Sequence, residues 1–539
     1  MIKTSILRGF AIILLFVSTP WAFSAKISAQ NKAKGYVFED LNNNGKKDRK
    51  EKGIPGVAVS NGRDIVVTDA DGKYEINVNR HCIIFAIKPK GYISPVNHQQ
   101  QPQNYYIHKP DGSPAALKYK GSEPTGELPS LLNFPMKAYE DPENFRFFAF
   151  GDPQPYSVKE VEYFRRAIVE ETKTYKGISF GISLGDVVGN HLNLHPLYLD
   201  AIKDMEIPWY HVIGNHDRNY DAGEEKFANE TFESNFGPST YAFRYGNAHF
   251  IILDDIFMHL APKSNPYKGG FSEEQFEFLE NYMKLVKKGE LVILSYHIPI
   301  AYKDGQFIDS HRRKLFKILS GHNVFGLSAH THIQMQFFYG NDLGWDGEEP
   351  FHEYNVGTSN GDWYSGKLDE RGLPDTTMRD GTPQGYAIVN IKNDKYTFDY
   401  KSEGMPIEHQ MTVYSPKIIP CKQGGKYPLY TNFYIGTPND KVEFRIDKKE
   451  WKKMNRVTNE ADPTYLSILN EWDKAEHAIK GRRPNSVPTT CTHLWKAVLD
   501  NTLEPGEHNI EIRATDMFGR IHTAKHSYKI EIIPENEKD

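Results

Sequence analysis

The stretch that decides the fold reads Gly214-Asn215-His216-Asp217, and it follows an apolar run over residues 209–213. In an open α/β sheet, the loops that leave the carboxyl ends of parallel strands meet at one face. We therefore expect one metal-binding pocket, lined by the side chains of five such loops. The other four also close strand-like runs, and they read Gly151-Asp152-Pro153-Gln154, Gly185-Asp186, Ser295-Tyr296-His297 and Ala329-His330-Thr331-His332.

These clusters resemble the pattern of calcineurin-like metallophosphoesterases, which reads Asp-x-His, Gly-Asp, Gly-Asn-His-Asp/Glu, His and Gly-His-x-His. All five blocks appear in order across residues 152–332. Two positions depart from the pattern, because Gln154 stands where the family usually has His and Ala329 replaces the Gly of the last block. The resemblance implies an α/β fold, a four-layer α/β/β/α sandwich. Apolar periodicity alone would not choose it over a doubly wound sheet.

The resemblance also implies two divalent metal ions, which we expect to be manganese, iron, zinc or magnesium. Such a pair can share a hydroxide that attacks a phosphate ester in line, while His216, oriented by Asp217, assists the leaving group. Gln154 is a weaker ligand than His, so the first ion should be labile. By position in the family pattern, the first ion takes Asp152, Gln154, Asp186 and His332, and the second takes Asp186, Asn215, His297 and His330.

The amino terminus predicts export. Lys3 and Arg8 precede an apolar run over residues 10–17 and a small-x-small site at Ala22-Phe23-Ser24, so residues 1–25 are predicted to be a signal peptide and the protein to be periplasmic or secreted. That run is shorter than the roughly 20 residues that span a bilayer, although a retained anchor is the alternative. No later stretch predicts an integral membrane segment. A net charge of −5 without a long basic run argues against nucleic acid as a partner.

A chain of 539 residues suggests about three domains. Residues 33–135 alternate strand-like runs and turns, which is typical of a small prealbumin-like β-sandwich, and they end in a linker. Residues 140–402 are the predicted catalytic domain, and residues 405–536 an Ig-like β-sandwich with a helical insertion. Metallophosphoesterases with β modules at both ends form a bacterial branch that this chain resembles. Cys421 and Cys491 are the cysteine pair within one domain, but the sequence does not establish a disulfide.

Residues 40–51 match a twelve-residue calcium loop at positions one, three, five, six, nine and twelve. No EF-hand helix pair flanks them, and the run instead resembles the Asp-x-Asn-x-Asn-Gly loops of secreted β modules. An Asn-rich turn that binds nothing is the alternative. The candidate calcium ligands are Asp40, Asn42, Asn44, Asp48 and Glu51.

Two Gly-rich loops follow the last His cluster, and we expect residues 355–366 to line the pocket and residues 375–386 to form a lid. The candidate substrate contacts are His191, Trp363 and Arg379, with ordinary packing turns as the alternative. The predicted function is an exported phosphoesterase that acts on a small-molecule phosphate ester or a phosphoprotein. Monoesters are favoured because the Gly-Asp-Pro-Gln block resembles that of phosphomonoesterases. The alternatives are a phosphodiesterase on cyclic nucleotides or glycerophosphodiesters, and a non-catalytic surface binding protein.

Overall fold

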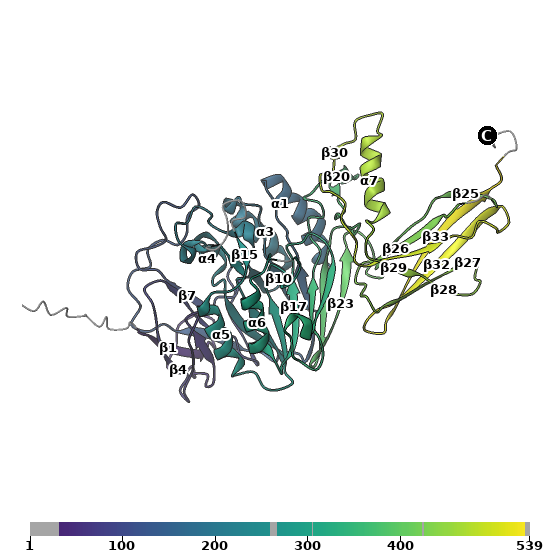
Figure 1. The fold of residues 1–539 in the computed structure, drawn as a ribbon. Helices are drawn as coiled ribbons and strands as arrows, with labels where there is room; N and C mark the ends of the chain where they lie inside the picture. Colours follow the sequence, from purple (N-terminus) through teal and green to yellow (C-terminus); the bar gives the residue numbers. More distant parts are fainter. Residues whose placement is uncertain (1–31, 259–266, 304, 423–424, 534–539) are drawn as a thin grey trace, which may run out of the picture.

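The structure is a computed structural model that describes residues 32–258, 267–303, 305–422 and 425–533. The predicted signal peptide lies outside these residues. The described chain forms three parts in sequence order, with the catalytic domain between two β-sandwiches (Figure 1). Within the described ranges, no helix is long and apolar enough to cross a membrane.

The amino-terminal module is a sandwich of two four-stranded sheets, ordered β4-β1-β8-β6 and β3-β2-β5-β7. Alternate residues of the strands point inward, and Val37, Val59 and Ile84 are fully buried between the sheets. Strand β8 pairs with β1 and carries the module past the predicted boundary at residue 135. Strand β7 pairs with β5. The strands are β1 (Lys32–Glu39), β2 (Ala58–Ser60), β3 (Ile65–Val67), β4 (Lys73–Asn77), β5 (Cys82–Ala86), β6 (Tyr92–Ile93), β7 (Tyr105–His108) and β8 (Phe134–Ala138).

The catalytic domain is built on two sheets that face each other. The first has the order β11-β10-β9-β22-β23, and the second β12-β13-β16-β17-β19-β18. Their strands are β9 (Asn144–Phe150), β10 (Ile178–Leu184), β11 (Trp209–Val212), β12 (Tyr241–Tyr245), β13 (Ala248–Ile252), β16 (Leu291–Ser295), β17 (Asn323–Ser328), β18 (Met335–Tyr339), β19 (Phe351–Asn355), β22 (Gly385–Lys392) and β23 (Lys395–Ser402). A two-stranded sheet of β14 (Ile256–Phe257) and β15 (Lys268–Gly269) lies beside them.

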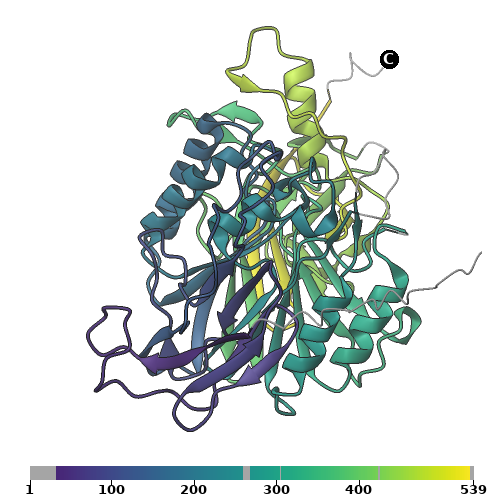
Figure 2. The same cartoon turned by 90° about the vertical axis from the view of Figure 1, so that its left-hand side faces the viewer.

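The side chains of these strands alternate between three cores, which makes the domain four layers deep. Phe147 of β9 packs between the sheets against Phe180 and Phe250, whereas its neighbour Phe148 points outward to the helices of the first sheet. Figure 2 shows one helical group on each outer side with the sheets between them. The four-layer α/β/β/α prediction is therefore confirmed. The principal helices are α1 (Val158–Phe164), α3 (His195–Ile202) and α4 (Glu230–Phe236) on the first side, and α5 (Glu273–Met283) and α6 (Asp309–Leu319) on the second.

Two helices show how local sequence sets their limits. In α5, the Ser272 side chain accepts the N–H of Gln275 while the Gln275 side chain accepts the N–H of Ser272, which forms a capping box. On the first side, the helical run from Val158 to Thr172 consists of three joined pieces, because a π-helical turn (Arg165–Val169) separates α1 from α2 (Glu170–Thr172).

The carboxy-terminal module is a second β-sandwich, with sheets ordered β24-β26-β31-β29 and β25-β33-β32-β27-β28. Trp495 is buried in its core beside Phe433, and Cys421 and Cys491 are both free. An insertion carrying α7 (Pro463–Asp473) and β30 (Gly481–Arg482) reaches back to the catalytic domain, where β30 pairs with β20 (Gly366–Leu368) and β20 with β21 (Pro374–Asp375). The sandwich strands are β24 (Met411–Tyr414), β25 (Ile418–Pro420), β26 (Pro428–Phe433), β27 (Lys441–Ile446), β28 (Lys452–Lys453), β29 (Asn455–Val457), β31 (Leu494–Val498), β32 (Gly506–Thr515) and β33 (Ile521–Glu531).

Candidate metal centre

The five polar loops meet where β9, β10 and β11 of the first sheet and β16 and β17 of the second end. Several of their residues have positive φ angles, a conformation that costs energy for any residue except glycine. Such strain persists where the surrounding structure imposes it, and here it turns the side chains toward a common centre. The φ angles are 38° at Asp152, 39° at Gln154, 48° at Asp186, 70° at His330 and 56° at His332.

His297 is held with one ring nitrogen facing the centre. Its Nδ1 lies 2.8 Å from the carbonyl oxygen of Leu184, which can only accept, so Nδ1 carries the hydrogen and Nε2 points inward. Nε2 lies 3.3 Å from Oδ2 of Asp186 and 3.1 Å from Oδ1 of Asn215. Burial alone would lower the pKa of His297, but the carboxylates of Asp186, Asp152 and Asp255 together outweigh it and raise the pKa to about 10. Positive charge is favoured at this point, and a bound cation would supply it.

His330 completes the second predicted ion position. Its Nδ1 lies 3.2 Å from Nε2 of His297, and its backbone N–H donates to Oδ2 of Asp152 at 2.9 Å. Burial, and then the charge of His297, lowers the pKa of His330 to about 3, which keeps its imidazole neutral and able to bind a metal. Ligand atoms of Asp186, His297 and His330 all lie within 4.8 Å of one another. Asn215 is the fourth predicted ligand.

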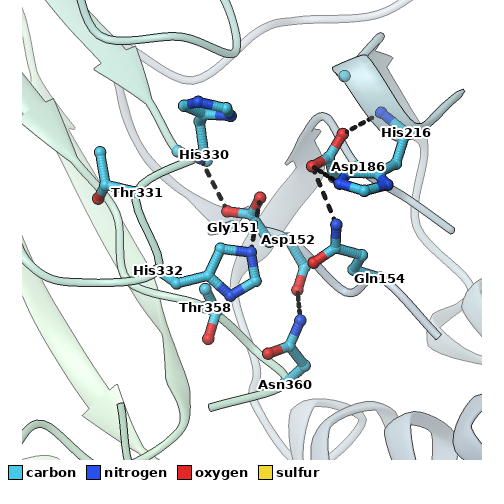
Figure 3. Close-up of polar contacts among 12 residues, drawn as sticks. Gly151, Asp152, Gln154, Asp186, His216, His330, Thr331, His332, Thr358 and Asn360 are labelled. Carbon is cyan, nitrogen blue, oxygen red and sulfur yellow. Dashed lines mark hydrogen bonds and ion pairs between the residues drawn. The ribbon is translucent and has the colours of Figure 1, made fainter. Parts of the chain in front are cut away.

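The first predicted ion position is bordered by buried polar atoms without partners. Oδ1 of Asp152 and Nδ1 of His332 make no hydrogen bond, although both residues are buried. Nε2 of His332 faces Oδ1 of Asp152 at 3.6 Å (Figure 3). Buried polar atoms in proteins are normally satisfied, so these atoms fit a bound cation. The carboxylate, imidazole and amide donors suit manganese, iron, zinc or magnesium.

Gln154 is fixed in one amide orientation. Its nitrogen donates to Oδ2 of Asp186 at 3.2 Å, and its oxygen accepts the indole N–H of Trp363 at 2.8 Å. An indole N–H can only donate, so the Gln154 oxygen must face it. One lone pair of that oxygen remains for a metal ion, while Trp363 also stacks on His332 with ring centroids 4.2 Å apart.

His216 lies beside Asp186 with its ring partly exposed. Its backbone N–H donates to Oδ1 of Asp186 at 2.7 Å, and its Nδ1 lies 2.8 Å from Oδ1 of Asn190. Nε2 is 4.0 Å from Oδ2 of Asp186. The ring is therefore oriented by Asn190, and the prediction that Asp217 orients it is wrong.

Asp217 instead ties two metal-binding loops together. Its carboxylate accepts the backbone N–H groups of Val187, Val188 and Gly214, and lies 3.3 Å from Nε2 of His195. Successive side chains of the turn Asn215–Asp217 point in different directions, so Asp217 faces the interior while His216 faces the pocket. His195 is buried with it, away from the pocket beside His216.

The three predicted substrate contacts lie in different surroundings. His191 is exposed at the rim, where Tyr156 lies between it and His216. Trp363 is part of the metal centre. Arg379 is half-buried and donates from Nη2 to the carbonyl oxygen of Thr331 at 2.9 Å. The loop over residues 375–386 is not the predicted lid, because Asp380 within it is buried and bonded to the carboxy-terminal module.

Some residues at the site were missed by sequence reasoning. Asn190 is the clearest, and its only signal is the polar Gly-Asn pair that follows the Gly-Asp block. A pocket of about 520 Å³ also opens beside His216, and part of its wall comes from Lys118 and Tyr119, in the segment between β7 and β8. Nothing in the composition of that segment pointed to the site.

The candidate calcium loop closes on its own hydrogen bonds. The Asp40 carboxylate accepts the N–H groups of Asn44 and Gly45, and the Glu51 carboxylate accepts those of Leu41 and Asp48. The side-chain amides of Asn42 and Asn44 both donate to Oδ2 of Asp48, at 2.8 and 3.0 Å. Calcium binding stays a prediction, which calorimetry of the full chain would test.

Three family models match the chain, and together they cover most of it. Residues 145–334 match the calcineurin-like phosphoesterase model. Residues 41–123 match the model for the N terminal of calcineurin-like phosphoesterase, and residues 353–522 match the one for its C terminal. A search of curated proteins finds no match.

Two solved structures show weaker similarity. A purple acid phosphatase from yellow lupin (Lupinus luteus) seeds is 13% identical, over 65% of this chain and 67% of that one, with a TM-score of 0.35. A cold-active protein-tyrosine phosphatase of a psychrophilic Shewanella species is 9% identical, over 64% and 98%, with a TM-score of 0.22. These scores are too low to argue from. The family matches show that this chain belongs to the calcineurin-like phosphoesterases, with the companion domains of that family at both ends, and is a phosphoester hydrolase.

Proposed function

We propose that this metal-dependent hydrolase is an exported enzyme that acts on phosphate monoesters. The observation that supports it best is the convergence of buried polar atoms, with Oδ1 of Asp152 making no hydrogen bond and Nε2 of His297 facing Oδ2 of Asp186. Asp152 and Asp186 are the anionic members of the ligand set, so two divalent ions would leave a net positive field. Such a field attracts a monoester dianion more strongly than a diester monoanion. The export proposal rests on the signal-like pattern of residues 3–24.

Bound divalent ions would supply a nucleophile from water at neutral pH and neutralise charge on the transferred group. The chain would hold them with Asp152, Asp186, Asn215, His297, His330 and His332, together with the free lone pair of Gln154. The backbone carbonyl of Leu184 fixes the tautomer of His297, and Asp217 holds the loops that carry Asp186 and Asn215.

His216 is placed to assist the departing alcohol. Asn190 accepts the Nδ1 hydrogen of the His216 ring, so Nε2 is the atom left to face the leaving oxygen. In its protonated form this nitrogen can donate a proton or a hydrogen bond as the ester bond breaks.

The test measures hydrolysis of p-nitrophenyl phosphate and of bis(p-nitrophenyl) phosphate by the metal-reconstituted full chain. We expect a higher kcat/KM for the monoester. Asp186→Asn should lose both bound metal and activity, whereas Asp346→Asn, a change at an exposed residue outside the site, should keep both. A strong preference for the bis ester would make the protein a diesterase. Unchanged activity in Asp186→Asn would refute the assigned centre.

Export is tested separately by fractionating cells that express the full-length chain. We expect the protein in the periplasm or the medium, shortened by a signal peptide. Full-length protein that stays in the cytoplasm would overturn this part of the proposal without affecting the enzymatic part.

A further inference from the structure

A pocket opens directly beside the metal centre on the side of His216. Its volume is about 520 Å³, within the range of about 300–1,000 Å³ typical of sites for small organic molecules. His216 belongs both to this pocket and to the hydrogen-bonded group around Asp186. A group attached to the leaving oxygen would therefore extend into the pocket when that oxygen lies at His216. The wall includes Lys118, Tyr119, Asn190, Tyr220 and Tyr267.

The pocket wall is fixed by hydrogen bonds that join segments far apart in sequence. The backbone N–H of Lys118 donates to Oδ2 of Asp221 at 2.5 Å, 103 residues away. The carbonyl oxygen of Tyr119 accepts the hydroxyl of Thr231 at 3.0 Å. The hydroxyl of Tyr220 donates to the carbonyl oxygen of Asn215 at 2.7 Å, so this ring rests against a predicted metal ligand. The wall is thus formed before any ligand arrives.

The chemistry of the wall is aromatic and nearly neutral. Three tyrosines, Tyr119, Tyr220 and Tyr267, line the pocket. The guanidinium of Arg218 is occupied by Glu225 and Asp254 and is almost fully buried. Among the lining residues that the structure describes, the other carboxylate and ammonium groups are those of Asp221 and Lys118, which are opposite in charge.

A neutral wall of tyrosines favours flat rings. Aromatic rings attract one another in offset-stacked and edge-to-face arrangements, beyond the burial of apolar area. A saturated group of the same size fills such a pocket without that gain. The pocket therefore discriminates planar aromatic leaving groups from saturated ones, rather than charged leaving groups from neutral ones.

We propose that this pocket binds the leaving group of the substrate and selects alcohols that carry a planar aromatic ring, either aryl alcohols or nucleosides. The proposal rests on the phosphoester hydrolysis described above and adds the class of leaving group. Hydrolysis consumes one water, breaks the bond between phosphorus and the ester oxygen, and releases phosphate and the protonated alcohol. The aromatic ring of the substrate occupies the pocket beside His216 while its phosphoryl group lies at the metal centre.

The test compares pairs of monoesters that differ in the ring but not in the reactivity of the ester. Benzyl phosphate is paired with cyclohexylmethyl phosphate, and adenosine 5′-monophosphate with ribose 5-phosphate. With the metal-reconstituted full chain, we expect kcat/KM to be about tenfold higher for the aromatic member of at least one pair. Discrimination in both pairs indicates a general aromatic pocket, and discrimination in the second pair alone indicates a nucleoside pocket.

Two variants tie this preference to the wall. Tyr119→Leu keeps apolar bulk but removes the ring, and should lower the aromatic-to-saturated ratio about threefold to tenfold. Tyr267→Leu, on a separate segment, should act in the same direction if Tyr119→Leu fails to fold. Tyr139→Leu, a change at an exposed tyrosine of the amino-terminal module, is the matched control and should leave the ratio unchanged.

The outcomes separate this proposal from the proposed function. Equal kcat/KM values within both pairs would overturn the aromatic pocket and leave the hydrolase intact. Wild-type ratios in both pocket variants would overturn it as well. Failure to hydrolyse any of these monoesters, or p-nitrophenyl phosphate, would refute the monoesterase proposal on which the pocket depends.

Discussion

Replacing Trp363 by Phe should weaken binding of the first metal ion without removing any ligand. The indole N–H of Trp363 donates a hydrogen bond to the Gln154 side-chain oxygen at 2.8 Å, and this bond orients that oxygen. The Trp363 ring also covers His332, with the two planes 22° apart. Phenylalanine keeps an aromatic face for His332 but has no N–H group. The substitution therefore isolates the orienting hydrogen bond.

The size of the effect follows from the burial of Gln154, which is 1% exposed. A buried polar atom that loses its partner costs about 1–3 kcal/mol. Loss of an outer hydrogen-bond partner of a metal ligand typically weakens metal affinity about 10–100-fold, which is the same range of free energy. We expect about a tenfold rise in the dissociation constant of the first ion, with the second unchanged, because Asn215, His297 and His330 do not contact Trp363.

The assay is metal titration by calorimetry, with metal content after dialysis against a chelator as a second readout. Trp345→Phe is a matched control, because Trp345 also donates its indole N–H at 2.8 Å, to the carbonyl oxygen of Glu349, outside the metal centre. It should leave metal affinity unchanged. Unchanged or tighter binding in Trp363→Phe would refute the reasoning, and tighter binding would show that Trp363 competes with the metal for the Gln154 oxygen.

The remaining predictions concern four residues. His216→Gln should lower kcat about 10²–10⁴-fold at unchanged metal content, and a parallel loss of metal would make His216 a structural residue. Asp217→Asn should lower the free energy of unfolding, measured in urea, by about 2 kcal/mol, because an amide nitrogen would face backbone N–H donors. A lower kcat at unchanged stability would instead indicate a catalytic role for Asp217. Gln154→His should retain the first ion longer against a chelator, since imidazole is a stronger ligand than an amide oxygen, and equal retention would contradict this. Burial raises the pKa of Glu353 from an ordinary 4.5 to about 7. Between these values the folded chain holds a proton that the unfolded chain has lost, so stability should fall as the pH rises through this window, by up to about 3 kcal/mol. Glu353→Gln should flatten that fall when urea unfolding is compared at pH 5 and pH 8, and an unchanged slope would place the titration elsewhere.

The metal-binding loops could be predicted from sequence because each is a local pattern. An apolar run that ends in Asp, Asn or His is visible within ten residues, and the end of a strand determines where such a side chain points. The four layers could not be read from the same runs. Phe147 and Phe148 are equally apolar, yet one packs between the sheets and the other under the helices. The family resemblance, rather than periodicity, supplied that part of the fold.

The contacts that orient the ligands were not predictable for a different physical reason. Gln154 and Trp363 are 209 residues apart in sequence. A local sequence pattern does not indicate which donor and acceptor form a hydrogen bond across such a separation. Adjacency in sequence was misleading at Asp217, because neighbours in a tight turn face opposite ways. Asn190, which takes the role expected of Asp217, lies 26 residues from His216.

Residues of the carboxy-terminal module and of the segment between β7 and β8 both reach the site. The insertion of the carboxy-terminal module bonds to the loop that carries Trp363: the backbone N–H of Asn485 donates to Asp362 at 3.1 Å, Ser486 donates to the same carboxylate, and Arg482 donates to the carbonyl oxygen of Trp363. The segment between β7 and β8 supplies Tyr119 to the pocket beside His216. The carboxy-terminal module thus holds the residue that orients a metal ligand, and the segment between β7 and β8 forms part of the wall of the proposed leaving-group pocket. Changes in either region can therefore alter metal affinity or substrate preference while every ligand stays in place.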